Sequence, residues 1–207
     1  MAENPRFWDK IAKKYAERPI SDEVLYRRKL SATQACFTPD SEVFEFGCGT
    51  GGTALEHAPH VRSVTAIDVS SEMIRIAKER QKEAGIENVA FVESGIDAYA
   101  DSDRQYEAVL GLNILHLVED PSAVINKVGA MVKPGGVFVS STFCADDNMS
   151  WFKIPARLGR AIGKLPYLKF FKYAELIENL RNAGFTIEVE WRGGKMNADF
   201  IIARKTG

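Results

Sequence analysis

Cysteine is scarce in this chain: Cys36, Cys48 and Cys144 lie far apart among 207 residues and show no metal-ligand spacing. The sequence therefore indicates neither a disulfide framework nor a cysteine metal site, and we expect no metal and a reduced, cytoplasmic setting. Long apolar runs are also missing. None reaches the roughly 18 residues of a membrane span, and the polar N-terminus lacks a signal-peptide core.

An excess of either charge is missing too. The 27 basic and 28 acidic residues nearly cancel, so no overall field would attract a polyanion, and we expect no nucleic-acid partner. An apolar content of 45% with 27% charged residues is ordinary for a soluble globular protein. The length of 207 residues suits a single domain with a sizeable core, which we place over residues 1–207.

The most informative feature is an apolar run that stops at alternate glycines. Val43–Phe46 is followed by Gly47, Gly49 and Gly51. Glycine lets a loop lie flat against a ligand, because it has no side chain to block the approach. The next apolar run ends in Asp68, and an acid at the tip of that strand can accept from both hydroxyls of a ribose. Together these features predict a nucleoside-containing cofactor at the carboxyl ends of a parallel sheet.

The glycines alone fit two kinds of cofactor site. Gly47, Gly49 and Gly52 match the dinucleotide fingerprint of NAD(P)-dependent oxidoreductases, whereas Gly47, Gly49 and Gly51 match the loop of S-adenosylmethionine-dependent methyltransferases. Glu45 favours the second, because a negative charge there would oppose a pyrophosphate but suits a cationic amine or sulfonium. The loop also follows two helical segments, whereas a dinucleotide domain more often begins with this strand.

Apolar periodicity and turn residues predict alternating strands and helices after residue 40, the pattern of a parallel sheet covered on both faces. The last two strands, joined by Gly193 and Gly194, should pair antiparallel. We therefore expect an α/β, Rossmann-like three-layer sandwich, whose mostly parallel seven-stranded sheet has an antiparallel C-terminal strand. The expected strands are 42–46, 62–67, 89–93, 106–110, 136–143, 185–191 and 197–204. The expected helices are 52–58, 71–84, 121–131 and 173–183, with a turn at Pro134–Gly136.

Two helical regions lie outside this alternation. Residues 1–40 are predicted to form an N-terminal helical cap of two helices, separated by Pro19. Residues 147–172 are predicted to form a helical insert, in which a basic stripe lies beside an apolar stripe over residues 153–165. This insert has three alternative roles: a lid over an aromatic or prenylated acceptor, a weak contact with a membrane surface, or a solvated shield for the sheet end.

Several motifs, taken in order, resemble the class I S-adenosylmethionine-dependent methyltransferases over roughly residues 5–204. The motifs are the loop Glu45–Gly51, the strand end and helix start Ala66–Ile74, the fourth strand end Leu112–His116 and the turn Val132–Val137. The opening helix Phe7–Tyr15 resembles the small-molecule group that includes ubiquinone and menaquinone biosynthesis enzymes. The resemblance implies transfer of a methyl group from S-adenosylmethionine to an oxygen, carbon or nitrogen atom of a small-molecule acceptor.

The resemblance also implies which residues hold the cofactor. Glu45 would orient the methionine amino group, and Asp68 would accept from the ribose hydroxyls. Val69 and Met73 would enclose the adenine, although plain core packing is the alternative for Met73. The backbone after the third strand would read the adenine edge, although Gly95 stands where many relatives have an acid. The expected cofactor-binding residues are Tyr15, Glu45, Phe46, Gly47, Cys48, Gly49, Gly51, Asp68, Val69, Met73, Gly95, Ile96 and Asn113.

His116 is the candidate catalytic residue, because a histidine near the methyl group can accept a proton from an acceptor hydroxyl. A structural histidine is an equal alternative, and His57 and His60 are expected at the surface. Tyr15 folds over the cofactor or only packs its helix on the sheet edge. The segment Leu112–Leu115 lacks the proline-and-aromatic motif of DNA base methyltransferases, which counts against base methylation. The alternative functions are an NAD(P)-dependent oxidoreductase and a catalytically idle methyltransferase-fold binding protein.

Overall fold

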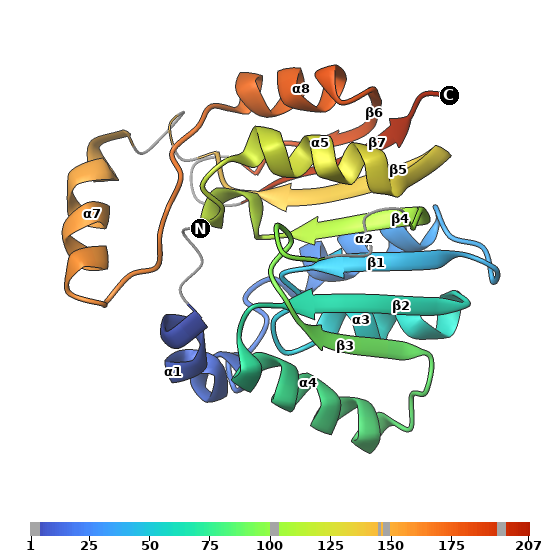
Figure 1. Cartoon of the computed structure of the whole chain (residues 1–207), viewed down its shortest axis with the longest axis horizontal. Helices are drawn as coiled ribbons and strands as arrows, with labels where there is room; N and C mark the ends of the chain where they lie inside the picture. Colours follow the sequence, from blue (N-terminus) through green and yellow to red (C-terminus); the bar gives the residue numbers. More distant parts are fainter. Residues whose placement is uncertain (1–4, 100–103, 145, 147–149, 194–197) are drawn as a thin grey trace.

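A seven-stranded sheet forms the centre of the chain (Figure 1). The computed structural model describes residues 5–99, 104–144, 146, 150–193 and 198–207. The strands are β1 (Glu42–Phe46), β2 (Ser63–Asp68), β3 (Val89–Glu93), β4 (Tyr106–Leu112), β5 (Val132–Thr142), β6 (Phe185–Trp191) and β7 (Asp199–Lys205). Their number and the α/β class agree with the sequence prediction.

The strand order in space is β3-β2-β1-β4-β5-β7-β6, and β7 is antiparallel to both of its neighbours. The pairs β1–β2, β1–β4, β2–β3 and β4–β5 are parallel, so their carboxyl ends share one edge of the sheet. Chain order reverses between β1 and β4, and such a reversal opens a crevice for ligands in open α/β sheets. The amino end of β7 lies at the same edge, because that strand runs the other way.

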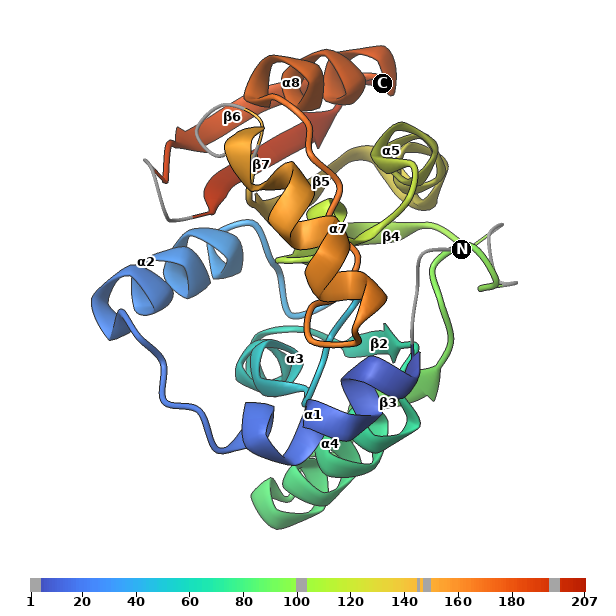
Figure 2. The same cartoon turned by 90° about the vertical axis from the view of Figure 1, so that its left-hand side faces the viewer.

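Helices cover both faces of the sheet (Figure 2). The helices are α1 (Pro5–Ala16), α2 (Glu23–Gln34), α3 (Gly52–His57), α4 (Ser71–Ala84), α5 (Pro121–Met131), α7 (Lys153–Ala161) and α8 (Tyr173–Asn182), with short 3-10 turns at Ala58–His60, Leu115–Leu117 and Ser150–Phe152. The helices α2, α3 and α4 lie on one face, and α5 and α8 lie on the other. Among the described helices, none is both long and apolar enough to cross a membrane.

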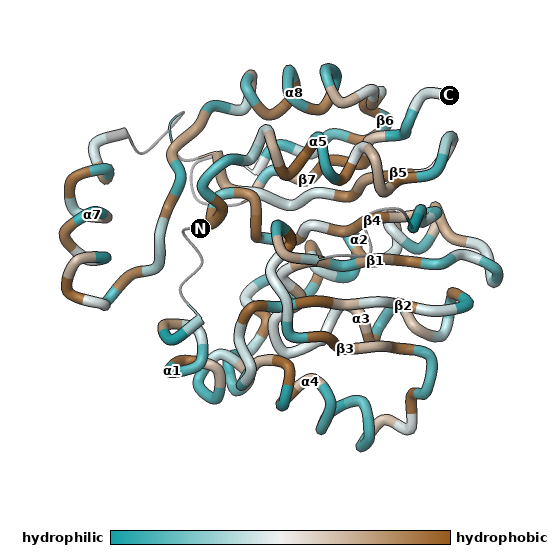
Figure 3. Tube along the Cα trace, viewed as in Figure 1, coloured by the Kyte–Doolittle hydropathy of each residue, from teal (hydrophilic) through white to brown (hydrophobic). Residues whose placement is uncertain are grey.

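The core has two halves, one on each face of the sheet. On β1, Val43 packs into the half under α3 and α4, whereas Phe44 and Phe46 pack into the half under α5 and α8. This alternation follows from the two-residue period of a strand. The strands are apolar along most of their length, whereas α4 is hydrophilic on its outer side (Figure 3). Buried strands between two helical layers explain why the sequence shows continuous apolar runs rather than alternation.

Most predicted element bounds agree with the structure. The ranges 42–46, 71–84, 89–93, 121–131 and 185–191 match β1, α4, β3, α5 and β6 residue for residue. The turn predicted at Pro134–Gly136 is wrong, because β5 already begins at Val132, which pairs with Tyr106. The ladder resumes at the pair of Ala108 and Val137, so the chain between them forms an irregular bulge, with Gly135 at φ +78°. Gly194 and residue 197 of the predicted hairpin lie outside the described residues.

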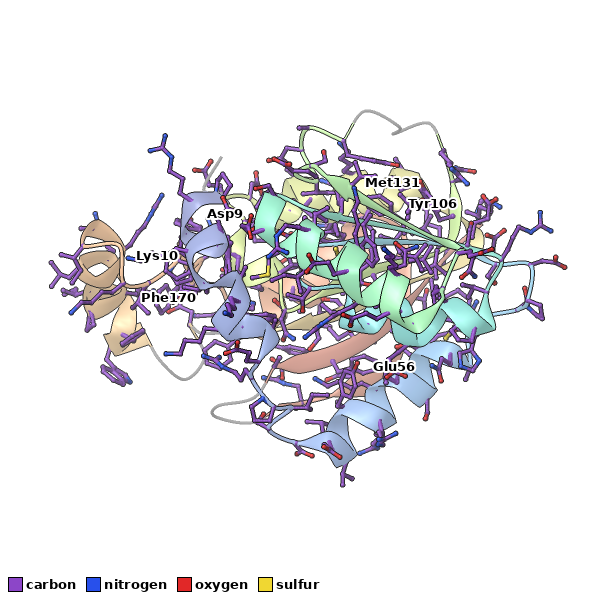
Figure 4. The ribbon with its side chains drawn as sticks, turned by 90° about the horizontal axis from the view of Figure 1, so that it is seen from below. Asp9, Lys10, Glu56, Tyr106, Met131 and Phe170 are labelled. Atoms are coloured by element: carbon purple, nitrogen blue, oxygen red, sulfur yellow. The ribbon has the colours of Figure 1, made fainter. Side chains whose placement is uncertain are left out.

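The N-terminal helices attach to the sheet edge through local polar contacts. The chain breaks around Pro19 as predicted, and the Asp22 side chain caps α2 by accepting from the Leu25 amide at 2.8 Å. Asp9 of α1 lies beside the start of α4 (Figure 4), where its Oδ1 accepts from the Ser70 hydroxyl at 2.6 Å and from the Glu72 amide at 3.2 Å. The start of α4 therefore fixes the position of α1.

Helix α7 stands away from the sheet, across its carboxyl edge (Figures 1 and 2). The helix ends at Ala161, so it is shorter than the stripe predicted over residues 153–165. The chain turns at Gly163, which has a φ of +69°. The apolar stripe predicted for this segment faces solvent: Ile154, Leu158 and Ile162 are 72%, 64% and 67% exposed. The apolar side chains of α7 therefore do not close over the sheet edge. Residues 147–149 of the predicted insert lie outside the described part of the chain.

Candidate active site

A cavity of about 300 Å³ opens at the carboxyl edge of the sheet. Its walls come from the ends of β1, β2 and β4, from α1, and from the segment that follows α7. The lining residues are Trp8, Tyr15, Phe46, Gly47, Gly49, Asp68, Val69, Met73, Ser94, Gly95, Ile96, Leu112, Asn113, Ile114, His116, Leu117, Val118, Pro166, Tyr167 and Leu168. Such an apolar hollow with a few polar groups is typical of a small-molecule site.

The loop after β1 presents its backbone to this cavity. Gly47 and Gly49 have φ of +68° and +53°, a conformation that favours glycine. A Cβ on Gly47 would lie 2.7 Å from Cγ1 of Ile114, whereas a Cβ on Gly49 would meet only Tyr15, at 3.6 Å. Gly47 is therefore required by packing. The backbone at Gly49 faces open space that a ligand can fill.

Gly51 has a different role from the two glycines before it. It caps the start of α3 with φ +76°, and a Cβ there would lie 2.6 Å from Cζ of Phe91 and 2.9 Å from Cβ of Ala77. Neither Gly51 nor Cys48 lines the cavity. Burial raises the pKa of the Cys48 thiol, so this side chain stays neutral. Both residues therefore support the loop from behind.

Asp68 ties the end of β2 to the glycine loop. Its Oδ2 accepts from the Gly49 amide and its Oδ1 accepts from the Ser70 amide, both at 2.9 Å. Burial raises the pKa of Asp68, and the Ser70 and Gly49 amides oppose that rise. The two carboxylate oxygens offer about four acceptor sites, and the amides of Ser70, Gly49 and Val69 use three of them, so acceptor capacity remains for a ligand in the cavity. Ser70, rather than Asp68, caps α4, because its hydroxyl accepts from the Met73 amide.

Glu45 lies beneath the loop and does not line the cavity. Its side chain is 2% exposed, and its Oε2 has no hydrogen-bond partner among the described residues. Burial, together with the charge of Asp68, raises the pKa of Glu45 to about 8. A buried acid without a partner is destabilising when it ionises. A positive charge bound nearby would therefore favour the ionised form of Glu45 at neutral pH.

Asn113 stands where β4 ends. Among the described non-glycine residues, Asn113 alone has a positive φ, at +57°. Its amide donates to the Ser141 carbonyl at 2.6 Å. Asparagine tolerates this conformation better than most residues. The turn carries the chain from β4 across the cavity wall to Ile114, and the β5 backbone holds it in place.

His116 also lines the cavity, on the 3-10 turn after β4. Burial lowers its pKa to about 4, so the ring is neutral at physiological pH. Its Nδ1 lies 3.4 Å from the Phe143 amide, which donates to it, and 3.2 Å from the Thr142 hydroxyl. With Nδ1 accepting from Phe143, the neutral ring carries its proton on Nε2. This arrangement favours a hydrogen-bond donor over a general base.

A second cavity of about 260 Å³ adjoins the first, between α2 and the ends of β4, β5 and β7. The two cavities share Leu112 and Asn113 in their linings. The other lining residues of the second cavity are Ile20, Ser21, Asp22, Leu25, Tyr26, Lys29, Leu30, Thr33, Thr53, His57, Ser141, Ala198 and Phe200. Two small hollows that meet at the end of one strand can hold two reactants side by side.

The surface position expected for His57 is wrong. The side chain is fully buried, and its ring packs edge-on against Phe37, with centroids 5.1 Å apart. Burial lowers its pKa to about 4, and neither ring nitrogen has a partner among the described residues. The sequence did not show this, because His57 sits at the end of a short helix whose buried face is set by α2. His60 is exposed, as predicted.

Most of the predicted cofactor residues do meet in one place. Tyr15, Phe46, Gly47, Gly49, Asp68, Val69, Met73, Gly95, Ile96, Asn113 and His116 line the first cavity, whereas Glu45, Cys48 and Gly51 lie behind it. The sequence placed the 94–97 loop, with Ser94, at this site and the 147–172 insert beside the acceptor, but it did not assign Trp8 or single out Pro166–Leu168. The aromatic residues of the opening helix and of the insert were visible in the sequence. Only the fold shows that both reach the same cavity.

Comparison with known proteins gives the cavity a context. The methyltransferase-domain family matches residues 43–136. A ubiquinone biosynthesis O-methyltransferase of Xanthomonas axonopodis pv. citri is 31% identical over 154 residues, covering 72% of this chain and 64% of that protein. The corresponding protein of Serratia proteamaculans is 33% identical over 104 residues, covering 50% of this chain and 43% of that protein.

Solved structures share the fold. The N-methyltransferase NodS of Bradyrhizobium japonicum WM9, in complex with S-adenosyl-L-homocysteine, has a TM-score of 0.68 at 17% identity and covers 97% of this chain and 99% of that one. The [4+2]-cyclase SpnF has a TM-score of 0.70 at 18% identity and covers 86% of this chain and 80% of that one.

Residues 43–136 match the methyltransferase-domain family, and solved methyltransferase structures share the fold of most of the chain. The resemblance and the Rossmann-like fold predicted from the sequence are confirmed. The dinucleotide-dependent oxidoreductase is not favoured. The chain spans 64% of the length of the Xanthomonas relative, just under two thirds. The [4+2]-cyclase shares this fold, so the fold alone does not fix the reaction.

Gly51 and Gly52 offer a matched pair for testing the loop. Gly51→Ala should lower the free energy of unfolding by about 2–4 kcal/mol, because the new Cβ is strained at positive φ and overlaps the Phe91 ring. Gly52→Ala should stay within about 1 kcal/mol of the original protein, since a Cβ there meets nothing within 4 Å. Urea unfolding measures both. Equal stability of the two variants would contradict the packing role of Gly51.

Proposed function

We propose that this protein transfers a methyl group from S-adenosylmethionine to a small-molecule acceptor. The observation that carries the proposal is the pair of cavities that share Leu112 and Asn113 at the end of β4. When bound, S-adenosylmethionine supplies an activated methyl group on a sulfonium. The protein then needs to hold the two reactants in line, and positioning alone can supply roughly 7–11 kcal/mol of the barrier.

The first cavity fits the cofactor. The free lone pairs of Asp68 suit the ribose hydroxyls, and the open backbone at Gly49 suits the methionine end. Val69 and Met73 provide an apolar wall for the adenine, and the backbone at Gly95 and Ile96 can read its edge. Tyr15, Phe46 and Asn113 complete the enclosure.

Glu45 supplies the charge that complements the cofactor. The side chain is buried beneath the loop, so it acts on the methionine ammonium through its field or through water rather than by lining the cavity. A cation in the cavity lowers the pKa of Glu45 from its raised value, because it stabilises the ionised form. The binding of the amino group and the ionisation of Glu45 should therefore be coupled.

The second cavity is the proposed acceptor site. It lies beside the first at the carboxyl edge, and it has the size of a small organic molecule rather than of a nucleic-acid strand. The nearly balanced charge of the chain also favours a small-molecule acceptor over nucleic acid. His116 lines the first cavity and not the second, so with its proton on Nε2 it would donate to an acceptor oxygen that reaches the cofactor side.

We also propose that residues 1–207 form a single domain, with residues 1–40 as a helical cap and the 147–172 insert as a lid. Within the described part of the insert, α7 holds the segment that covers the first cavity. Arg160 lies 4.7 Å over the ring of Tyr167, and the Lys169 amide donates to the His116 carbonyl at 2.8 Å. The lid therefore works through Pro166–Leu168 rather than through the apolar stripe.

In addition to the lid, the exposed stripe of α7 favours a weak contact between residues 153–165 and an anionic membrane surface. Ile154 and Leu158 of α7 and Ile162 just after it are exposed, and the same segment carries basic side chains. An amphipathic helix of this kind lies in the membrane interface with its apolar face inward.

Asp68→Asn should weaken binding of S-adenosyl-L-homocysteine about 10- to 100-fold, because a charged acceptor for the ribose hydroxyls is lost. Glu93→Gln is the matched control, since Glu93 pairs with Asp68 on the neighbouring strand but does not line the cavity. Calorimetric titration gives both affinities. Equal affinities for the two variants would refute the ribose contact.

The double variant Leu158→Ser and Ile162→Ser should bind vesicles rich in phosphatidylglycerol at least about tenfold less tightly, because it loses the exposed apolar surface of α7. Val24→Ser is the control, since Val24 is 81% exposed on another helix. Vesicle co-sedimentation measures the affinity. Absence of wild-type binding, or a preference for neutral phosphatidylcholine, would rule out the membrane contact.

A further inference from the structure

Lys29 places a positive charge in the wall of the second cavity. The side chain projects from α2 and is half-buried, and its Nζ donates to the Ser141 hydroxyl at 3.1 Å. An ammonium group has three donors. Within the described residues, Lys29 makes no ion pair, so donors remain for a ligand in the cavity.

The acids nearest to Lys29 are already engaged. Asp199 is 5% exposed, and its Oδ1 accepts from the Arg192 Nε and from the Gly193 amide, both at 2.9 Å. Asp22 accepts from the Leu25 amide as the cap of α2. Burial lowers the pKa of Lys29, whereas the charges of Asp199 and Asp22 raise it. A half-buried ammonium without a direct counter-ion is costly, and an anion in the cavity would remove that cost.

One wall of the cavity is suited to a flat apolar body. Phe200 lies beneath the ammonium, with its ring centroid 5.6 Å from the Lys29 Nζ. Leu25 and Leu30 from α2 and the side chain of Ile20 add further apolar surface. An aromatic ring stacks or packs well against such walls. The described lining of this cavity of about 260 Å³ therefore sets the Lys29 ammonium beside an apolar wall, and it also includes the Asp22 carboxylate, which is engaged as the cap of α2.

Lys29 is also connected to the place where the two cavities meet. The Ser141 hydroxyl that accepts from Lys29 lies 3.5 Å from the Asn113 Oδ1, to which it donates. Asn113 lines both cavities. A small molecule that is held by Lys29 at its charged end therefore extends along the wall that leads to the cofactor.

We propose that Lys29 is a specificity-determining residue that selects a small aromatic carboxylate as the methyl acceptor. The proposal rests on the proposed function, since it names the class of compound that the acceptor cavity takes. A carboxylate fits better than a phenol as the charged end, because a carboxylic acid is ionised at neutral pH whereas an ordinary phenol is not. The carboxylate acts as the anchor and leaves another atom of the ring system to face the cofactor.

The test compares acids with their neutral amides in protein saturated with S-adenosyl-L-homocysteine. Benzoate and naphthoate, each set against its amide, are titrated and followed by ligand-observed NMR. The original protein should prefer the acids by about tenfold or more, since a charged hydrogen bond is lost in the amides. Lys29→Met should remove that preference and leave amide binding unchanged, and Lys29→Arg should keep most of it.

Arg27→Met is the matched control, because it removes one positive charge from an exposed position on the same helix. It should leave the preference for acids intact. Equal binding of acids and amides to the original protein, or an unchanged preference in Lys29→Met, would overturn the role of Lys29. The affinity for S-adenosyl-L-homocysteine is measured separately in each variant and reports whether the domain is folded. Failure of the original protein to bind this compound would overturn the proposed function instead.

Discussion

The site depends on the bond between Asp68 and the amide of Gly49. This contact joins the end of β2 to the loop after β1, and both partners lie at the edge where chain order reverses. The loop can present bare backbone to a ligand only while something else holds it, because glycines alone are costly to order. Asp68 holds it in front, and Gly51, packed against Phe91, holds it from behind. The same carboxylate that stabilises the loop has lone pairs left for a ribose.

Two cavities divide the carboxyl edge of the sheet between them. The first cavity lies over β1, β2 and β4, and the second lies over β4, β5 and the start of β7. Their common wall is the strained turn at Asn113, which the Ser141 carbonyl holds. Antiparallel β7 matters here, because it brings Phe200 to the edge where the parallel strands end. Methyl transfer needs two ligands held in line, and this arrangement provides adjoining places for them.

The sequence predicted the features of the fold and of the site that depend on local signals. Apolar periodicity, with glycine or proline at several element ends, predicted five elements residue for residue. The spacing of Gly47, Gly49 and Asp68 located the first cavity. Contacts between segments that are far apart in the sequence could not be predicted. Lys29 and Ser141 are 112 residues apart, and nothing local reveals that they meet. His57 looked like a surface residue because the partner that buries it, Phe37, belongs to the chain before β1. Pro134 and Gly135 signalled a turn, but the paired Val132 keeps them within β5.

Calorimetric titration with S-adenosyl-L-homocysteine, in buffers of different ionisation enthalpy, tests the central claim most directly. Glu45 is mostly protonated at pH 7, because burial raises its pKa to about 8. Binding of the ammonium should therefore release about one proton at pH 7 and progressively less as the pH rises above 8. Glu45→Gln should abolish the release, whereas Glu56→Gln, at an exposed position on α3, should not. Binding without proton release, or binding of NAD in place of this compound, would contradict the account.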